Sequence, residues 1–192
     1  QPDMPEGVEE GIKKGLYLYQ KNSTSKSKRV VQLMGSGTIL REAIAAAELL
    51  KEHFEVDADI WSATSFNELR RDGLRTARWN LLHPEEKPKV SHVEACLKDI
   101  KGPVVAATDY MKTYADQIRE FVPGRYTVLG TDGFGRSDSR EKLRRFFEVD
   151  RAFITLAALN SLVQENMIDA GAVKKAMDMF EIDPEKQDPA VS

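Results

Sequence analysis

The sequence predicts an α/β protein with a three-layer α/β/α architecture. Short runs rich in β-branched residues alternate with segments whose apolar residues recur at helical spacing, as in parallel β-α-β units. The run PVVAATD, residues 103–109, is a continuous series of β-branched residues and alanines, which is typical of a strand covered on both faces. A length of 192 residues with 41% hydrophobic residues suits one domain with a sizeable core.

The chain begins with a lead-in, residues 1–28, that precedes the main domain. After an acidic opening comes a short apolar run, GLYLY at residues 15–19, and the polar stretch that follows it is expected to form a flexible turn. The main α/β domain is expected over residues 29–181. Residues 182–192 are expected to form a frayed tail.

The first half of the main domain contains two predicted strands, each followed by a helix. The run VVQLM, residues 30–34, is the first strand, and the apolar positions from Leu40 onward trace one face of a helix. The run ADIWSAT, residues 58–64, is the second strand. We expect the next helix to be short and to end at Gly73, with residues 74–90 as a long surface connection that contains a short helical turn.

The second half continues the alternation. Ser91 is expected to cap the helix that holds Cys96, and the strand at residues 103–109 leads into a helix whose apolar face runs from Met111 to Phe121. The remaining predicted elements are a strand over residues 125–130, a helix over 141–147, a long helix that begins after the capping residue Asp150, and a last helix over 170–180.

Composition argues against several classes of function. The net charge is −3, with 28 basic residues spread among 31 acidic ones, so no global electrostatic attraction to nucleic acid is expected. No apolar run approaches the roughly 20 residues needed to span a bilayer, and the first residues lack the pattern of a signal peptide, so we expect a cytoplasmic protein without membrane contact. The single cysteine, Cys96, cannot form an internal disulfide and is expected to be a small buried hydrophobe.

Two motifs raise the possibility of cofactor or metal binding. MGSGTIL follows a strand and precedes a helix, as a dinucleotide fingerprint does, but Leu40 stands where the third glycine belongs and no acidic residue ends the second strand. We favour a tight strand-to-helix turn. His92 and Cys96 are four residues apart and could share a metal with His83, but no further cysteine or carboxylate completes the set, so we expect no metal site.

Asp109 and Asp132 each follow a predicted parallel strand, and such strand ends meet at one edge of a sheet. Two carboxylates there could divide the roles of acid and base if their environments separate their pKa values. The alternative is that each caps a helix or a turn by accepting backbone N–H bonds. We favour capping.

The loop GTDGFGRSDSR, residues 130–140, combines glycines with charged residues. Asp138 and Glu141 fit a capping box for the helix that follows, with Ser137 or Ser139 as an alternative cap. Capping does not explain why Phe134 and Arg136 project from a glycine-rich turn at the edge of a sheet. A large apolar group next to a fixed cation is typical of an interface anchor.

Several segments together resemble one known family. QLMGSGTILREAIAAAELL, DADIWSATSFNELRRDG, RWNLLHP and the stretch from GPVVAATDYMK to SREKLRRFFEVD closely resemble the carboxyl-terminal portion of the pyruvate dehydrogenase decarboxylating component, in its bacterial homodimeric form. The resemblance covers nearly the whole chain. It implies a transketolase carboxyl-terminal-domain-like fold, with a mixed five-stranded sheet whose first strand, GLYLY, is antiparallel to the others.

The resemblance also implies a function for the complete enzyme. That enzyme decarboxylates pyruvate on thiamine diphosphate with magnesium and passes the acetyl group to lipoyl groups of the dihydrolipoyl acetyltransferase component. The family's cofactor signature, GDG followed by asparagines, is absent here, because RDG at residues 71–73 has only Asn80 close behind it. We therefore carry over no catalytic, cofactor-binding or metal-binding residue, and expect this chain to be inactive alone and to bind no cofactor.

The expected role is structural. Asp109, Asp132, Phe134 and Arg136 are the candidate contacts to partners, which would be the missing amino-terminal and middle domains or the second subunit of the homodimer. Two alternatives remain open: a free-standing module that binds a small anion or effector at the strand ends, with Arg136 as its cation, and a domain of another thiamine diphosphate enzyme such as transketolase.

Overall fold

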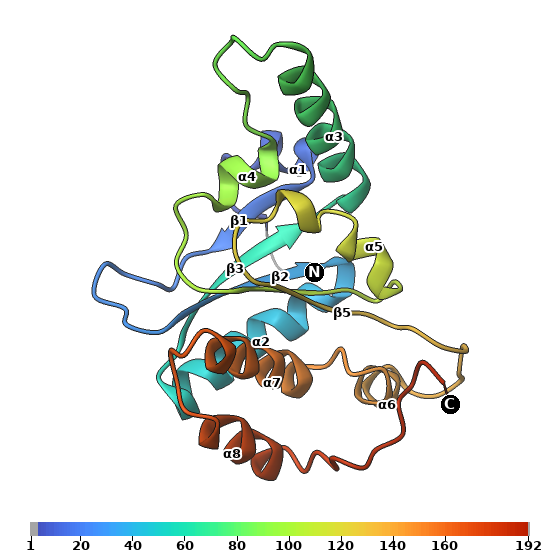
Figure 1. The fold of residues 1–192 in the computed structure, drawn as a ribbon. Helices are drawn as coiled ribbons and strands as arrows, with labels where there is room; N and C mark the ends of the chain where they lie inside the picture. The colour runs from blue at the N-terminus through green and yellow to red at the C-terminus, as the bar shows by residue number, and fades with distance from the viewer. Residues whose placement is uncertain (1–3, 192) are drawn as a thin grey trace.

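One five-stranded sheet separates two layers of helices (Figure 1). The computed structural model describes residues 4–191, so residues 1–3 of the predicted lead-in and residue 192 of the predicted tail lie outside the described residues. The strands lie in the order β1-β3-β2-β4-β5. Their bounds are β1 Leu16–Gln20, β2 Val30–Ser36, β3 Asp57–Ala63, β4 Val104–Ala107 and β5 Tyr126–Leu129.

The direction of each strand agrees with the resemblance. β1 pairs antiparallel with β3, with Leu16 opposite Ala63, and the other three pairings are parallel. The mixed five-stranded sheet with an antiparallel first strand is confirmed. Because β2, β4 and β5 are parallel neighbours, their carboxyl ends lie along one edge of the sheet.

The first helical layer packs its apolar residues against one face of the sheet. In Figure 1 this layer lies below the sheet. It contains α2 (Leu40–Phe54), α6 (Arg140–Phe146), α7 (Arg151–Gln164) and α8 (Gly171–Met179). The predicted stripe of α2 is buried at Leu40, Ala43, Leu50 and Phe54, where it meets Leu159 and Leu162 of α7 in one core. Burial of this stripe accounts for the position of α2.

The second layer covers the opposite face. It contains α3 (Phe66–Leu82), α4 (His92–Leu97), α5 (Lys112–Asp116) and the 3-10 turn η2 (Arg119–Phe121). Phe66, Leu69, Leu97 and Ile118 form its core with the sheet. Outside the two layers, α1 (Glu9–Lys14) precedes β1, and the 3-10 turn η1 (Gly37–Ile39) joins β2 to α2.

Two helix boundaries differ from the predictions. α3 does not end at Gly73 but continues to Leu82, so half of the predicted surface connection is helical. Gly73 is buried against Phe121, whose ring would lie 2.4 Å from a Cβ at this position, so the glycine permits close packing rather than ending the helix. The predicted helix from Met111 to Phe121 is wrong in length, because α5 stops at Asp116 and the chain tightens into η2.

The predicted helix caps are mostly confirmed. Asp150 accepts a hydrogen bond from the Phe153 backbone at the start of α7, and Ser91 forms a complete capping box with Glu94 at α4. The cap of α6 is Ser139, which accepts from Lys142 N, so the capping box based on Asp138 is wrong. Asp138 instead accepts a bond from Ser139 N.

The two segments predicted to be flexible make specific contacts. In the turn after β1, Asn22 N and Ser23 N both donate to the buried carboxylate of Asp59. The tail contacts α6, because Lys186 Nζ lies 2.8 Å from the Phe146 carbonyl and 2.9 Å from Glu148 Oε1. The composition of the tail indicated a frayed end, but these long-range contacts hold it on the domain.

Candidate functional site

The candidate site is the edge where β2, β4 and β5 end. The Ser36 hydroxyl donates to Thr108 Oγ1 over 2.8 Å, and both residues are buried, so the ends of β2 and β4 are tied together. The GSG motif ends β2 at Gly35 and Ser36, and its second glycine, Gly37, begins η1, which leads directly into α2. This packed turn agrees with the structural interpretation of the motif that we favoured over nucleotide binding.

Asp109 and Asp132 lie at this edge but take part in different contacts. Asp132 Oδ1 accepts a hydrogen bond from Lys112 N over 2.9 Å, at the first residue of α5. Asp109 Oδ2 accepts a long bond of 3.4 Å from the Thr38 hydroxyl. Asp109 lines the neighbouring cavity and Asp132 does not. The arrangement supports capping for Asp132 and does not support a paired acid and base.

A cavity of about 370 Å³ opens beside Asp109, between η1, the loop after β5 and α6. Its wall contains three arginines, Arg136, Arg140 and Arg144, together with Thr38 and Thr131. Arg140 and Arg144 were missed in the sequence. Their spacing of four residues from each other and from Arg136 is the signal that could have identified them.

The loop after β5 holds Phe134 and Arg136 in different ways. The Phe134 side chain is 78% exposed. The Arg136 guanidinium lies 4.2 Å from the centre of the Phe146 ring, a cation–π contact that directs it back onto α6. Gly133, at φ +107°, lies so close to the tail that a Cβ would sit 2.0 Å from the Pro189 carbonyl oxygen. The loop therefore presents Phe134 from a fixed backbone.

An ion-pair cluster lies next to the cavity, because Arg144 belongs to both. The buried carboxylate of Glu42 contacts Arg144 at 2.9 Å and Arg151 at 3.0 Å. Burial alone would raise the pKa of Glu42, but the hydrogen bonds and charge of Arg151, with the charge of Arg144, hold that pKa below its ordinary value. Glu42 is thus a charged structural link between α2, α6 and α7.

The residues suggested as metal ligands are engaged in packing. His92 Nε2 lies 2.8 Å from the Leu16 carbonyl, and Cys96 Sγ lies 3.6 Å from the same ring nitrogen. His83 stacks on Trp79 with ring centres 4.3 Å apart. Among residues 4–191, no group of three or more His, Cys, Asp or Glu side chains is placed to hold a metal ion. Burial raises the pKa of the Cys96 thiol.

The RDG segment at residues 71–73 does not resemble a cofactor site in three dimensions. It lies inside α3, where Asp72 Oδ2 accepts a bond from His92 N and Gly73 packs on Phe121. The Asn80 side chain makes two hydrogen bonds to the backbone of Lys89. These groups have structural partners, so they do not fit the diphosphate and magnesium of thiamine diphosphate.

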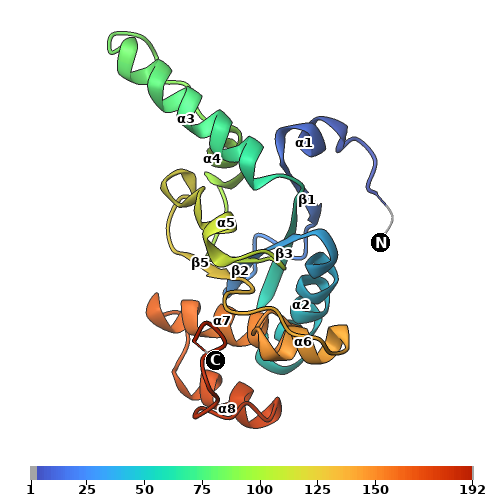
Figure 2. The same cartoon turned by 90° about the vertical axis from the view of Figure 1, so that its right-hand side faces the viewer.

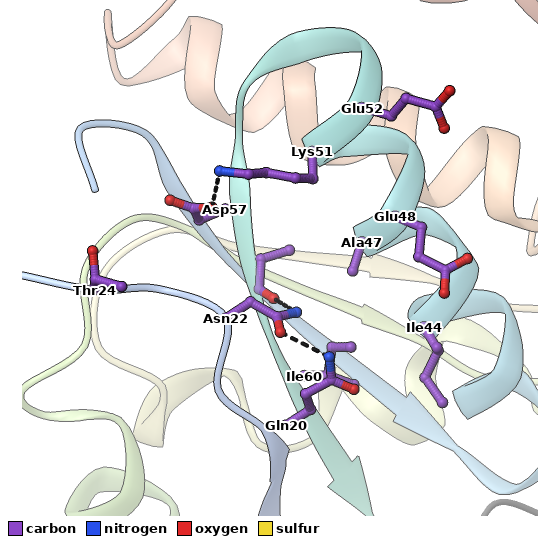
Figure 3. Close-up of a pocket in the computed structure, with 11 residues that line it drawn as sticks. Gln20, Asn22, Thr24, Ile44, Ala47, Glu48, Lys51, Glu52, Asp57 and Ile60 are labelled. Atoms are coloured by element: carbon purple, nitrogen blue, oxygen red, sulfur yellow. Dashed lines mark hydrogen bonds and ion pairs between the residues drawn. The ribbon is translucent and has the colours of Figure 1, made fainter. Parts of the chain in front are cut away.

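A second cavity, of about 500 Å³, lies at the other end of β3, between α2, β3 and the turn after β1 (Figure 3). Two pairs of its polar side chains bind each other: Lys51 Nζ is 2.7 Å from Asp57 Oδ1, and Gln20 donates to Asn22. Burial alone would raise the pKa of Asp57, but its bonds with Lys51 and Ser27 keep that pKa below the ordinary value. These contacts hold the turn after β1 and offer no group poised for chemistry.

Comparison with known proteins gives two kinds of similarity. A family model described as the transketolase-like TK C-terminal domain matches residues 15–150. The Pyruvate dehydrogenase E1 component of Pseudomonas aeruginosa is 58% identical over 190 residues, and that of Escherichia coli is 50% identical over 192 residues. These matches cover 98% and 100% of this chain. The chain spans only 21% of the length of either relative.

Solved structures support the fold. A transketolase from Pichia stipitis matches 88% of this chain and 21% of its own, with a TM-score of 0.57 and 16% identity. A transketolase from Leishmania mexicana matches 83% of this chain and 19% of its own, with a TM-score of 0.54 and 17% identity. No helix within residues 4–191 is long and apolar enough to cross a membrane.

Proposed function

We propose that this chain, which belongs to the transketolase-like TK C-terminal domain family, is the carboxyl-terminal domain of a pyruvate dehydrogenase decarboxylating component. The observation that carries the proposal is an identity of 50–58% to such proteins over essentially the whole chain. The solved transketolases share the fold at 16–17% identity, which makes transketolase the weaker assignment.

The complete enzyme, in this proposal, is a cytoplasmic homodimer that decarboxylates pyruvate and transfers the acetyl group to lipoyl groups of the acetyltransferase component. Thiamine diphosphate, with magnesium, supplies the decarboxylation chemistry there. This chain holds neither cofactor. The proposal is supported by the structural contacts of Asp72, Gly73 and Asn80 and by the three arginines at the strand ends, whose positive charge disfavours a magnesium ion.

The role of this domain is to build an interface with the remaining domains or with the second subunit. Phe134 supports this role, because an aromatic side chain that is 78% exposed on a fixed loop is the kind of residue that anchors interfaces when a partner buries it. Arg136, whose guanidinium lies over the Phe146 ring, adds a positive charge to the same loop. Asp109 and Asp132 lie at the neighbouring edge of the sheet. Preorganised groups of this kind bind with little loss of conformational entropy.

Titration calorimetry of this chain with thiamine diphosphate and magnesium, followed by an assay with pyruvate, tests the absence of chemistry. We expect no heat of binding above dilution and no release of carbon dioxide. Clear turnover by a purified sample would contradict the structural role.

The cavity beside Asp109 favours one second candidate, the binding of a small anion. Three arginines line a space of about 370 Å³, and within the described residues Arg140 has no ion-pair partner. Calorimetry with phosphate, pyruvate and a nucleotide tests this candidate. Binding that is lost in Arg140→Ala would favour a binding module, whereas a purely structural domain binds none of the three specifically.

A further inference from the structure

The second half of α3 and the loop after it extend away from the body of the domain (Figure 1 and Figure 2). We call residues 74–90 the arm. The buried residues of α3 are Phe66, Leu69 and Gly73, all before the arm. Burial in the domain core therefore fixes the base of the helix, whereas the residues of α3 beyond Gly73 are exposed or half-buried.

The arm is nevertheless well ordered by contacts at its tip. Trp79 stacks on His83. Lys89 Nζ, in the loop that returns from α3, lies 3.8 Å from the centre of the Trp79 ring. The Asn80 side chain donates to the Lys89 carbonyl over 3.0 Å and accepts from Lys89 N over 2.8 Å. A short helix without such contacts is marginal in water, so these interactions keep the arm rigid.

One face of this rigid helix is apolar and uncovered. Leu74, Ala77 and Leu81 recur at i, i+3 and i+7, which places them on one stripe, and all three are exposed. Leu81 is 77% exposed and Leu74 is 43% exposed. Leu74 also lines a cavity of about 530 Å³ with Met111, itself 60% exposed, so the apolar surface continues onto the strand-end edge of the domain.

On the helix the charges beside the stripe are mostly basic, whereas the loop of the arm also carries Glu85 and Glu86. Between residues 70 and 82 the helix carries the arginines Arg70, Arg71, Arg75 and Arg78 and a single acid, Asp72. The Asp72 carboxylate already accepts a bond from His92 N at the base of the arm. A partner of matching chemistry has an apolar groove for a helix and an acidic rim.

We propose that the arm docks into such a groove on the remaining part of the longer protein, with Leu74, Ala77 and Leu81 as the buried stripe. This inference rests on the proposed function, because the relatives of this chain are several times longer and the chain spans only 21% of them. We therefore take the partner of the arm to be another domain of the same enzyme, rather than a second copy of this chain or an unrelated protein.

Thiol labelling in the complete enzyme tests the arm with a matched control. Leu81 and Val191 are both 77% exposed in this domain, so Leu81→Cys and Val191→Cys start with equal access to a maleimide. We expect at least a tenfold slower reaction at the arm in the complete enzyme, with each labelled site located by mass spectrometry. Equal rates at the two sites would overturn the proposal.

A charge-reversed variant of the arm tests the acidic rim that we expect on the partner. Arg75→Glu combined with Arg78→Glu, in the Leu81→Cys background, is expected to raise the labelling rate at least fivefold by weakening docking. An unchanged rate would refute the acidic partner. The same Leu81→Cys change in this chain alone gives a further control. If its labelling slows as the protein concentration rises, the partner of the arm is a second copy of this chain, and the proposal is overturned.

Pyruvate decarboxylation by the same complete protein separates this proposal from the proposed function. An enzyme that decarboxylates pyruvate but labels both sites equally refutes the arm alone. A complete protein that protects the arm but fails to decarboxylate pyruvate with its cofactors refutes the assigned activity alone.

Discussion

Asp59 shows how a single buried charge organises a segment that looks flexible in sequence. Its carboxylate accepts bonds from Asn22 N, Ser23 N and the Ser23 hydroxyl, at 2.9, 2.8 and 2.6 Å. Burial alone would raise the pKa of Asp59, but these bonds outweigh burial and hold the pKa below its ordinary value. The polar composition of the turn could not reveal this anchor, because the partner lies about 36 residues away.

Replacing the anchor should destabilise the fold without a change in shape. We expect Asp59→Asn to lower the free energy of unfolding by about 2 kcal/mol, because charge-assisted bonds to buried groups are lost. Urea unfolding measures the change. The matched control is Asp109→Asn, an exposed residue with one long bond, for which a change below about 0.5 kcal/mol is expected. Equal effects at the two positions would refute the anchoring role.

Glu42 predicts a pH dependence of stability. Its pKa in the folded chain lies below the ordinary value of 4.5, so the unfolded chain binds a proton more readily. The stabilising contribution is therefore complete above about pH 4.5 and is lost as the pH falls through the lower pKa of the folded state.

Glu42→Gln should accordingly be less stable than the wild type at pH 7. The difference between the two should shrink as the pH is lowered below 4.5, since the carboxyl of the unfolded wild-type chain then binds a proton and that of the folded chain follows at lower pH. Denaturant unfolding at a series of pH values measures the free energy of unfolding of both proteins. A difference that stays constant down to pH 3 would be inconsistent with a charged Glu42 as the link between the helices.

At the scale of elements, the sequence patterns were sufficient for the alternation of strands and helices and for most helices, whereas the antiparallel first strand was predicted only by the family resemblance. The alternation of strands and helices, the stripe of α2 and the caps Ser91 and Asp150 depend on residues close in sequence, and all are confirmed. The end of α3 was wrong because a glycine has two uses, as a helix end and as a site of close packing. Only the distant residue Phe121 decides between them.

Gly73 gives a direct test of that explanation. Helix propensity alone predicts that Gly73→Ala stabilises α3 by up to about 1 kcal/mol. The contact with Phe121 predicts the opposite, a loss of about 1–3 kcal/mol, because the added methyl group overpacks the core. Thermal unfolding distinguishes the two signs. Phe121→Leu should reduce the loss on Gly73→Ala, whereas a stabilised Gly73→Ala protein would show that the packing account is wrong.

At the scale of the whole molecule, the described part of the domain exposes large apolar side chains, among them Phe134 and Leu81. Phe134 on the loop after β5 could be singled out in the sequence, because a large apolar residue stood in a polar, glycine-rich turn, and its side chain is exposed. The arm could not be predicted from the sequence, because the pattern of residues 74–90 indicated a surface connection. The cavity lined by Arg136, Arg140 and Arg144 also depends on tertiary structure.

The interface role of the loop predicts a defect in the complete enzyme. We expect Phe134→Ala with Arg136→Ala to weaken dimerisation or activity at least tenfold, measured by sedimentation and by acetyl transfer. Met179→Ala, an exposed change on α8, is the control and should leave both unchanged. Normal dimerisation and activity in the double variant would remove Phe134 and Arg136 from the interface.

The most direct test of the central claim is to purify the protein that carries this sequence from its natural source and determine its full sequence and its activity with pyruvate. The account predicts a much longer polypeptide, of which this chain forms about 21%, with a GDG signature before Gln1 and decarboxylation that requires thiamine diphosphate and magnesium. A native protein of only these 192 residues, or a longer one that has the cofactors but leaves pyruvate unchanged, would contradict it.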